Sequence, residues 1–501
     1  MKRRDFVLGT LAAPWLAACA SRNLDSGNWS RLQSGLDGEL LLPDDAAFES
    51  NRKLFNTRFD DIRPSAVARC KTAQDVRACL AFARRYNIPV HARSGRHSYA
   101  GWSTGPGLVI DVSPMNQVSL AAGSTVATIG AGAKLIDIYD GLAGQGRTLP
   151  GGSCPTVGIA GFALGGGISM LGRAYGLACD SLRQVEIVTA AGDILTCDAQ
   201  RHADLYWACR GGGGGNFGIV TSFRFQTQPL RNITTLNLDW DWALAPKVMK
   251  AWQTWAPHAP DEAWSNCRFL TNRTGPAPGP RVRILIVFLG DAAALEPLLP
   301  DLLGPIGAEP IRAVETMEGL YALRTLAGCR TVTVQQCHLA LTTESGTLNR
   351  PAMVGKSSFF DRPFSDEAIA TAMHHIELAQ AMPGLSSGTL LLDAFGGAIG
   401  RVDPAQTAFV HRTALFSSQF LAYWQESADE PTVARCRSWI RDFHTDMLRH
   451  SSGGAYVNYT DPELVDWQRA YYGANYDRLV RVKAAYDPHG LFQMPQGIPV
   501  A

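Results

Sequence analysis

The chain has 501 residues, of which 46% are hydrophobic and 18% charged, and its formal net charge at pH 7 is +1. This length accommodates two domains with complete cores, and the near-neutral charge argues against a nucleic-acid or acidic-surface partner held by bulk electrostatics. After residue 20, no apolar run approaches the roughly 20 residues that a membrane-spanning helix needs.

The first twenty residues have the pattern of an export signal. Arg3 and Arg4 stand before Phe6, and a mild apolar segment at 7–18 leads to Cys19. Twin arginines before a modest apolar segment indicate Tat export. Residues 16–19 also resemble a lipobox, in which the cysteine is lipidated; cleavage without lipid is the alternative. We expect an exported periplasmic or cell-envelope protein, a partner of the Tat machinery, which touches the membrane only through a lipid on Cys19. Residues 21–45 are polar and are predicted to be a tether.

Residues 46–230 are predicted to form a first domain that mixes helices and strands. Thr72 caps a predicted helix at 72–86, and Asp75 stands at the capping-box position. Ala191-Gly192-Asp193 separates two β-rich runs and predicts a hairpin. The pattern is α+β rather than the regular strand–helix alternation of a doubly wound sheet. Further strands are expected at 88–92, 107–112 and 125–130, and a helix at 134–142.

Residues 231–445 are predicted to form a second, sheet-based domain, and residues 446–501 to return to the first. Strands are expected at 281–289, 331–341 and 388–393, and helices at 246–255 and 366–380. The C-terminal segment contains a predicted helix at 476–485, which Asp487-Pro488 ends.

Three glycine-containing motifs carry the chemistry: RSGRHSY at 93–99, GGSCPTVG at 151–158 and GGGGGNFGIVT at 211–221. Glycine lets a chain lie close against something flat or anionic. A P-loop would need Gly-Lys-Ser/Thr, and a dinucleotide fingerprint would need GxGxxG between a strand and a helix; neither occurs. A Cys–His protease would pair His97 with Cys154, but no helix N-terminus lowers the pKa of the thiol. What remains is a large flat cofactor whose diphosphate is held by backbone N–H groups of the 93–97 loop.

The cysteines give no sign of a metal site. Of the 11 cysteines, those other than Cys19 and Cys154 are odd in number, so they cannot all pair. No CxxC or Cys/His ligand spacing occurs, which argues against structural zinc. An oxidising compartment permits disulfides, but the sequence does not assign them. The remaining cysteines are Cys70, Cys79, Cys179, Cys197, Cys209, Cys267, Cys329, Cys337 and Cys436.

Together with the ending YVNYTD…YYGANYDRL…YDPHGLFQMPQGIP, these motifs resemble the berberine bridge enzyme-like FAD-linked oxidases of the vanillyl-alcohol oxidase superfamily. The resemblance implies a two-domain PCMH-type FAD-binding fold with a separate antiparallel-sheet substrate domain. It also implies FAD held by two covalent bonds, from His97 to the 8α-methyl carbon and from Cys154 to ring carbon C6. Arg96 stands where the family usually has a second glycine. Expected cofactor contacts are Arg93, Ser94, Gly95, Arg96, Ser98, Val157, Gly158, Gly161, Gly218, Ile219, Val220, Asn458 and Asn475.

The resemblance further implies hydride transfer from a substrate C–H to flavin N5 while a base takes the hydroxyl proton. Tyr459, in the Asn-Tyr-x-Asp segment, is the candidate base, and near neutral pH its phenol would have to be stabilised as tyrosinate. Asp393 is expected to assist, and Tyr99 to face the substrate. The alternatives are packing roles for the two tyrosines and a strand-end hydrogen-bonding role for Asp393.

Val157 resembles the position at which valine leaves room for O2 beside flavin C4a and leucine blocks it. This favours an oxidase that makes H2O2 from a sugar, an oligosaccharide or an aromatic or allylic alcohol. The alternatives are a dehydrogenase that passes electrons to a quinone or carrier protein, and a non-catalytic flavin or carbohydrate binder.

Overall fold

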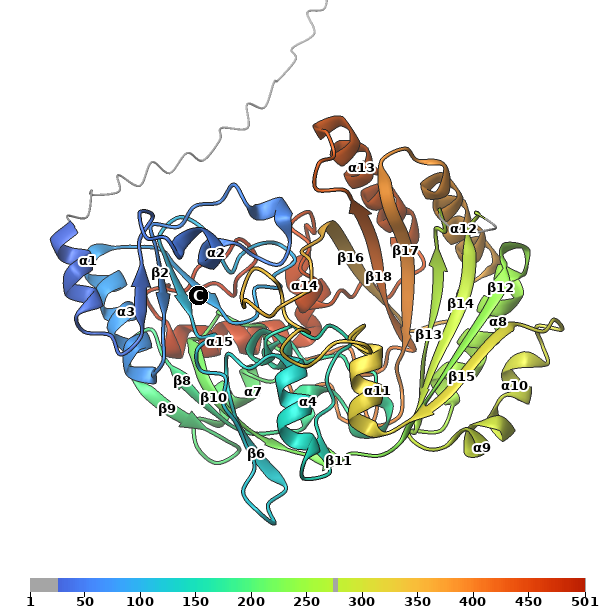
Figure 1. Cartoon of the computed structure of the whole chain (residues 1–501), viewed down its shortest axis with the longest axis horizontal. Helices are drawn as coiled ribbons and strands as arrows, with labels where there is room; N and C mark the ends of the chain where they lie inside the picture. Colours follow the sequence, from blue (N-terminus) through green and yellow to red (C-terminus); the bar gives the residue numbers. More distant parts are fainter. Residues whose placement is uncertain (1–25, 274–277, 501) are drawn as a thin grey trace, which may run out of the picture.

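The computed structural model describes residues 26–273 and 278–500, so the predicted leader and Cys19 lie outside the described residues. Two lobes built on β-sheets face each other, and a cavity lies between them (Figure 1). The first lobe contains the N-terminal half of the chain, and the C-terminal segment, coloured red, returns to lie among its elements (Figure 1). This mixed arrangement confirms the predicted α+β class.

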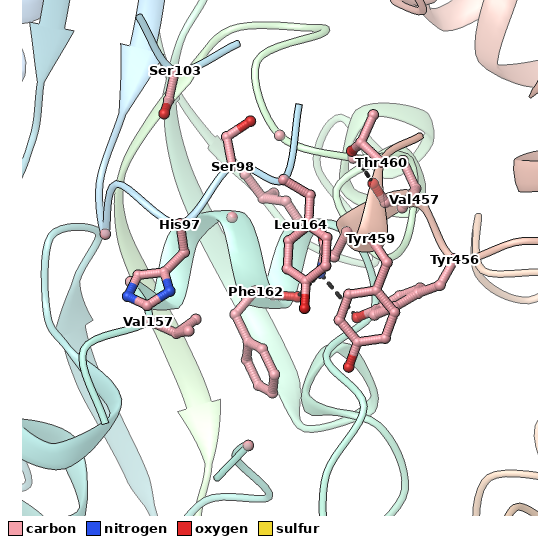
Figure 2. Close-up of a pocket in the computed structure, with 18 of the residues that line it drawn as sticks. His97, Ser98, Ser103, Val157, Phe162, Leu164, Tyr456, Val457, Tyr459 and Thr460 are labelled. Atoms are coloured by element: carbon pink, nitrogen blue, oxygen red, sulfur yellow. Dashed lines mark hydrogen bonds between the residues drawn. The ribbon is translucent and has the colours of Figure 1, made fainter. Parts of the chain in front are cut away.

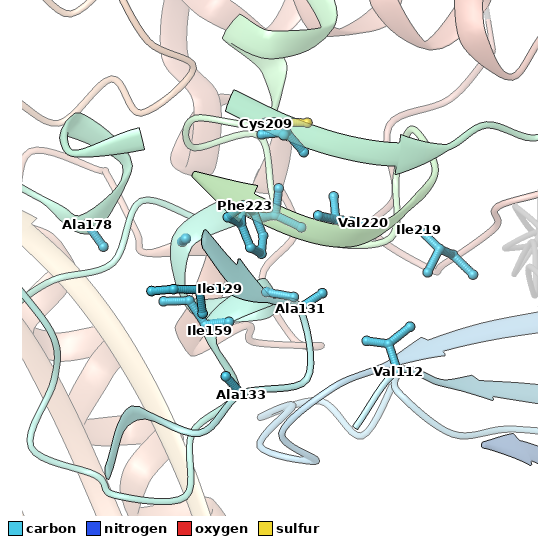
Figure 3. Close-up of a cluster of buried hydrophobic side chains, with 14 of the residues drawn as sticks. Val112, Ile129, Ala131, Ala133, Ile159, Ala178, Cys209, Ile219, Val220 and Phe223 are labelled. Atoms are coloured by element: carbon cyan, nitrogen blue, oxygen red, sulfur yellow. The ribbon is translucent and has the colours of Figure 1, made fainter. Parts of the chain in front are cut away.

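The first lobe contains a four-stranded and a five-stranded sheet. In the first sheet β2 and β3 run parallel to β4, whereas every pair in the second is antiparallel. Ile129, Ile159 and Phe223 belong to the buried cluster that joins the elements of this lobe (Figure 3). In spatial order the strands are β1 (Glu39–Leu41), β2 (Ala66–Arg69), β4 (Leu108–Asp111) and β3 (Val90–Arg93), then β5 (Val118–Ser119), β6 (Val126–Gly130), β10 (Ile219–Gln226), β8 (Leu182–Val188) and β9 (Ile194–Cys197). A small ribbon pairs β11 (Gln228–Pro229) with β7 (Arg147–Thr148).

Helix α3 shows how local sequence sets an element of this lobe. The Thr72 side chain accepts a hydrogen bond from the backbone N–H of Asp75, and the Asp75 carboxylate accepts one from the backbone N–H of Thr72. The predicted capping box is therefore present, and the β8–β9 hairpin is present as well. The helices of the lobe are α1 (Ser26–Gln33), α2 (Phe48–Arg52), α3 (Ala73–Tyr86), α4 (Leu135–Ala143), α5 (Ile159–Leu164), α6 (Gly172–Tyr175) and α7 (Ala203–Ala208).

The predicted tether at 21–45 is wrong over most of its length. The ring of Trp29, in α1, lies 5.0 Å from that of Phe82 in α3, and the Tyr86 hydroxyl donates to Asn28 Oδ1 at 2.8 Å. Strand β1 pairs with β2, and Leu40 is buried. A few large apolar residues dock the segment onto the lobe although its composition is polar.

The second lobe is built on one antiparallel sheet, of which one face packs against helices and the other faces the cavity. Because successive side chains alternate in direction along a strand, Leu390 and Leu392 of β17 pack against helices, whereas Leu391 and Asp393 face the cavity. Helices α8, α12 and α13 cover the first face (Figure 1). In spatial order the strands are β15 (Ile311–Met317), β12 (Ile233–Asp241), β14 (Arg281–Phe288), β13 (Ala263–Leu270), β17 (Leu385–Ala394), β18 (Phe416–Trp424) and β16 (Ala352–Phe360). The helices are α8 (Ala245–Trp255), α9 (Ala292–Leu295), α10 (Pro300–Leu303), α11 (Gly319–Leu326), α12 (Asp366–Ala381) and α13 (Glu430–Leu448).

The strand predicted at 331–341 does not form. A disulfide between Cys329 and Cys337 closes this stretch into turns, and Val332 and Val334 pack against the core of the first lobe. The alternating apolar residues thus cover a neighbouring surface instead of pairing in a sheet. We call residues 327–350 the clipped loop.

The C-terminal segment returns to the first lobe with α14 (Trp467–Tyr472) and α15 (Tyr476–Tyr486). Lys483 of α15 donates to the carbonyl of Asn216 at 2.8 Å, which ties the segment to the third glycine motif. The two lobes are also joined by Arg173 of α6, whose guanidinium donates to the carbonyls of Pro257, Ala259 and Phe395. Among the described residues, no helix has both the length and the apolar character needed to cross a membrane.

Candidate active site

A cavity of about 640 Å³ lies between the lobes. The first lobe contributes the three glycine motifs, the second lobe contributes one face of its sheet, and the C-terminal segment closes the remaining side. In Figure 2, His97 and Val157 lie on one side of the pocket and Tyr456 and Tyr459 on the other. The predicted residues that line it are Arg93, Ser94, Gly95, Arg96, His97, Ser98, Tyr99, Cys154, Val157, Gly158, Gly161, Gly218, Ile219, Val220, Asp393, Asn458 and Tyr459.

The 94–98 loop has the shape of an anion cradle. Within the described part of the chain, none of the five backbone N–H groups of residues 94–98 has a protein acceptor. Such a run of free amides binds phosphate oxygens well. A Cβ on Gly95 would lie 2.0 Å from the nitrogen of Gly158, so the first and second motifs pack directly against each other only because both positions are glycine. These residues fit the diphosphate of a dinucleotide.

A buried ion pair and a hydrogen bond from a buried lysine hold this loop from behind. Arg93 contacts Asp111 at 2.8 Å, and Lys134 donates to the carbonyl of Ser94 at 3.0 Å. Burial opposes ionisation of Asp111, but Arg93 and Arg96 together hold its pKa below the usual range. Burial lowers the pKa of Lys134 to about 8. The loop is therefore fixed before any ligand binds, which spares the cost of ordering it.

Arg96 keeps the conformation that glycine would have, with φ at +67°. Its guanidinium points away from the free amides: it donates to the carbonyls of Ser50 at 2.9 Å and Lys53 at 3.2 Å, and to Asn51 Oδ1 at 3.2 Å. These bonds offset the strain of the left-handed backbone. The guanidinium of Arg96 is thus directed to the 50–53 segment, while the residue itself still lines the cavity.

The structure keeps His97 neutral. Its Nε2 lies 2.8 Å from Thr156 Oγ1, and Phe55 stacks on the ring at 3.9 Å between centroids. Burial, together with the nearby Lys134, lowers the pKa of His97 to about 3. The imidazole is therefore unprotonated at neutral pH, as a nucleophile must be.

Cys154 is a free, partly buried cysteine in the loop that precedes α5. Burial raises its pKa to about 11, so the thiol is protonated at neutral pH. Val157 lies three residues on, and its carbonyl accepts a hydrogen bond from the N–H of Leu135. Both residues line the cavity.

Asp393 supplies a buried carboxyl group at the end of the cavity formed by the second sheet. It stands on β17 directly opposite Asn266 of β13. Burial raises its pKa to about 6, while Arg268 and a hydrogen bond with Asn266 work in the opposite direction. A carboxyl group in this range is ionised at neutral pH and is more basic than an ordinary aspartate, which suits general-base chemistry.

Tyr459 and Tyr99 stand together at the same end of the cavity, with their rings 5.1 Å apart. Gln419 of β18 joins them: its Nε2 donates to the Tyr459 oxygen at 2.6 Å, and its Oε1 accepts from the Tyr99 hydroxyl at 3.2 Å. Burial, with contributions from Tyr99 and Asp393, raises the pKa of Tyr459 well above its usual value. The donated hydrogen bond favours a phenolate, but the surroundings as a whole do not stabilise one.

The C-terminal segment places Tyr459 through several contacts. Asn458 donates to the carbonyl of Phe162 at 3.0 Å, and the Tyr456 oxygen accepts from the N–H groups of Gly167 at 2.9 Å and Ile168 at 3.3 Å. On the far side, Asp461 forms a buried ion pair with Lys356 of β16 at 2.7 Å. Tyr459 is thus held between both lobes.

Asn475 does not line the cavity. Its side-chain nitrogen donates to the carbonyls of Pro404 at 2.9 Å and Thr407 at 3.1 Å, and the residue is buried. The expected cofactor contact is corrected to a structural anchor for the 404–408 stretch.

Gln419, Asn266 and Arg268 line the cavity but carry no sequence motif. All three stand on strands of the second lobe, and they alternate with helix-facing apolar residues such as Cys267 and Phe420. The alternation of cavity-facing and helix-facing residues along these strands is the only signal for them that a sequence can offer. It tells which side chains share a face but not which face meets the first lobe.

Comparisons with known proteins bear on the identity of the cavity. The profile of the FAD binding domain family matches residues 64–198, and the profile described as berberine and berberine like matches residues 455–499. The FAD-linked oxidoreductase YgaK of Bacillus subtilis is 35% identical over 93% of this chain and 97% of its own length. The xylooligosaccharide oxidase of Thermothelomyces thermophilus is 29% identical over 89% of each chain.

The fold comparison agrees. The structure of BBE-like 1 from Physcomitrella patens superimposes with a TM-score of 0.85 and 28% identity, covering 95% of this chain and 99% of that one. The free amides of the 94–98 loop and the cavity between the lobes fit FAD. This chain therefore belongs to the berberine bridge enzyme-like FAD-linked oxidoreductases of the PCMH-type superfamily.

Proposed function

We propose that this FAD-linked oxidoreductase is an oxidase that converts a hydroxyl group of a carbohydrate or other alcohol to a carbonyl, with O2 as the electron acceptor. The observation that carries the proposal is the convergence of Asp393, Tyr459, Tyr99 and Gln419 in the same cavity that the flavin motifs line. A non-catalytic binder would have no need for a carboxyl group with a raised pKa beside a phenol. The xylooligosaccharide oxidase among the relatives supports the substrate class.

FAD, when bound, supplies the hydride acceptor. The chain's residues handle the proton and the orientation of the substrate. We propose that Tyr459 and Asp393 share the proton of the substrate hydroxyl. Because the pKa of Asp393 is about 6 while that of Tyr459 is raised above its usual value, Asp393 is the member that is ionised at neutral pH, and the proton ends on its carboxylate. Gln419 holds the Tyr459 oxygen at 2.6 Å and so fixes its direction.

We further propose that His97 and Cys154 hold FAD through two covalent bonds. They line the same cavity from different motifs, and His97 is held as a neutral imidazole. Val157 supports O2 as the acceptor because it is a small side chain on the wall formed by the flavin motifs. Export by the Tat route and lipidation of Cys19 complete the proposal, on the sequence pattern alone.

The test is a screen of mono- and oligosaccharides and benzylic alcohols, with peroxide detected in air and flavin reduction followed without oxygen. We expect at least one compound to bleach the flavin and to yield peroxide. Val157→Leu should slow reoxidation by O2 without slowing reduction. Rapid bleaching with negligible peroxide, but with fast transfer to a quinone, would favour the dehydrogenase. If no hydroxylated compound bleaches the flavin, the proposal fails.

A further inference from the structure

Arg268 is a cation in the cavity wall with which no carboxylate of the described residues forms an ion pair. It stands on the cavity face of β13, in line with Trp264 and Asn266. Its Nε donates to Asn266 Oδ1 at 3.0 Å. Across residues 26–273 and 278–500, its two terminal amino groups have no hydrogen-bond acceptor, and no carboxylate lies within ion-pair distance. The forked end of the guanidinium is thus free at the cavity.

The two arginines of the adjacent strand β14 differ from Arg268, because both form ion pairs with carboxylates. Arg283 of β14 stands opposite Arg268 in the sheet register, but it contacts Asp239 at 2.6 Å. Arg281 contacts the same Asp239 at 2.5 Å and Asp241 at 2.8 Å. Neither Arg281 nor Arg283 lines the cavity. The protein therefore pairs the two arginines that lie outside the cavity and leaves the one inside it unpaired.

Asp393 is the carboxyl group that acts electrostatically on Arg268, and it does not form an ion pair with it. It stands on the adjacent strand opposite Asn266, whereas the residue opposite Arg268 is Leu391. Asn266 is next to both groups, because it accepts a hydrogen bond from Arg268 and stands directly opposite Asp393, whose pKa it lowers. Asn266 thus lies between the guanidinium and the carboxyl group, and both of them line the same cavity.

A partly buried guanidinium without a carboxylate is costly, because burial removes water that the protein does not replace. Burial lowers the pKa of Arg268, which records this cost. A ligand carboxylate would replace the missing partner, since two parallel N–H groups match its two oxygens. A phosphate dianion is a poorer match, because Arg268 is the one cation that the described strands of the second lobe place in the cavity wall, and phosphate sites usually gather several donors.

We propose that Arg268 binds a carboxylate of the substrate, so that the enzyme acts on hydroxylated acids such as sugar acids or hydroxymethyl-substituted aromatic acids. The acid group lies on the guanidinium fork while the hydroxyl group faces Asp393 and Tyr459. This assignment rests on the proposed oxidase function and narrows its substrate class.

The test compares ligands that differ only in the acid group, at constant ionic strength, with the holoenzyme. The pairs are methyl β-D-glucuronide against methyl β-D-glucoside, and benzoate against benzamide, with binding followed by the change in flavin absorbance. In at least one pair, we expect the acid to bind about tenfold to a hundredfold more tightly, as for a charge-assisted hydrogen-bonded pair. Arg268→Gln should abolish this preference for the acid.

Two further variants separate charge recognition from damage to the fold. Arg268→Lys keeps the cation and should keep part of the preference, and Arg283→Gln removes the paired arginine on the next strand and should keep all of it. Equal binding of acid and neutral partner in both pairs, or no binding of either acid, would overturn the proposal. So would a preference that survives Arg268→Gln.

The substrate-class assignment and the oxidase function fail separately. A protein that prefers the acids through Arg268, but whose flavin no hydroxylated compound reduces, would retain the Arg268 assignment and lose the oxidase function. A protein whose flavin is bleached by neutral alcohols, and which binds acid and neutral partner equally, would keep the oxidase function and lose the assignment.

Discussion

His97 and Cys154 meet different environments, although both are proposed to bond the same cofactor. His97 is neutral at pH 7, whereas the Cys154 thiol, with its pKa raised to about 11, has to lose a proton first. Each of the two covalent bonds should therefore form without the other. Precipitation of the wild type with acid should leave the flavin on the protein, and so should His97→Ala and Cys154→Ala, each through its remaining bond. The double variant should release flavin into the supernatant, and release of all flavin from the wild type would rule out covalent attachment.

The proton acceptor can be identified from the pH dependence of flavin reduction. Because the pKa of Asp393 is about 6, the rate of anaerobic reduction should rise with pH through that region as the carboxylate forms. Asp393→Asn should lose this limb and slow reduction by about 10²–10⁴-fold. Tyr459→Phe should slow reduction but keep the limb, since it removes only the phenol oxygen.

The reverse pH behaviour of the two variants would identify Tyr459 as the base. If Tyr459→Phe loses the limb while Asp393→Asn keeps it, the base is the tyrosine, as the Asn-Tyr-x-Asp motif suggests. Retention of bound flavin in both variants is the control, because it shows that the cavity still forms.

At the scale of single residues, the members of contiguous motifs were predictable from the sequence. The groups that bury or contact them in the fold were not. His97 and Cys154 could be named because glycine motifs mark them, and both line the cavity. The raised pKa of Tyr459 could not be foreseen, because it depends on burial by elements distant in sequence. Gln419 lies 40 residues before its partner Tyr459, and no local pattern links the two.

Among the elements, the clipped loop joins the second lobe to the first. His338, one residue after the disulfide cysteine Cys337, contacts Asp137 of α4 at 3.1 Å. Arg350, at the end of the loop, donates to the carbonyl of Leu54 at 2.7 Å. Leu326, just before the loop, lines the cavity. The loop therefore ties the second lobe to the first close to Leu326, a residue of the cavity wall.

The His338–Asp137 pair should make that docking depend on pH. The hydrogen bond with Asp137 raises the pKa of His338 above its ordinary value of 6.5. The ion pair is therefore complete below about pH 6.5 and is lost as pH rises through the raised folded-state pKa. His338→Gln should lower the melting temperature more at pH 6 than at pH 8, with the pair contributing about 0.2–1 kcal/mol. An equal difference at the two pH values would show that the ion pair adds nothing.

Elements were predictable where a local signal matched the tertiary demand. The Thr72 cap and the hairpin turn at Gly192 are such cases. The strand expected at 331–341 failed because alternating valines fit either a strand or a loop packed on a neighbour, and the disulfide decides between them. Segment 26–41 was misread because its few apolar residues are scattered among polar ones.

In the whole molecule, the cofactor site is assembled from the two ends of the sequence. The FAD binding match ends at residue 198 and the berberine-like match begins at residue 455, yet both regions line one cavity. The cavity is complete only after the entire chain has been made and the second lobe has folded. The proposed Tat export, which would carry a folded and flavin-loaded protein, agrees with this order of assembly.

The proposed lipid anchor can be tested on the intact protein. Cys19→Ser should lose labelling by radioactive palmitate and move from the membrane fraction to the soluble periplasmic fraction. Cys154→Ser alters the cavity only and should keep both the label and the membrane location. Equal labelling of wild type and Cys19→Ser, or retention of the wild type in the cytoplasm, would contradict anchoring at this residue.

The docking of α1 determines how far such an anchor would let the enzyme reach. Only seven peptide steps separate Cys19 from Ser26, where α1 begins, and a fully extended chain of that length spans about 25 Å. A long linker would let the enzyme diffuse far from the membrane, whereas a linker of this length would keep it within a molecular diameter of the lipid surface. Substrate would have to come to the membrane face, and residues inserted between positions 19 and 26 would widen the accessible zone without altering the catalytic cavity.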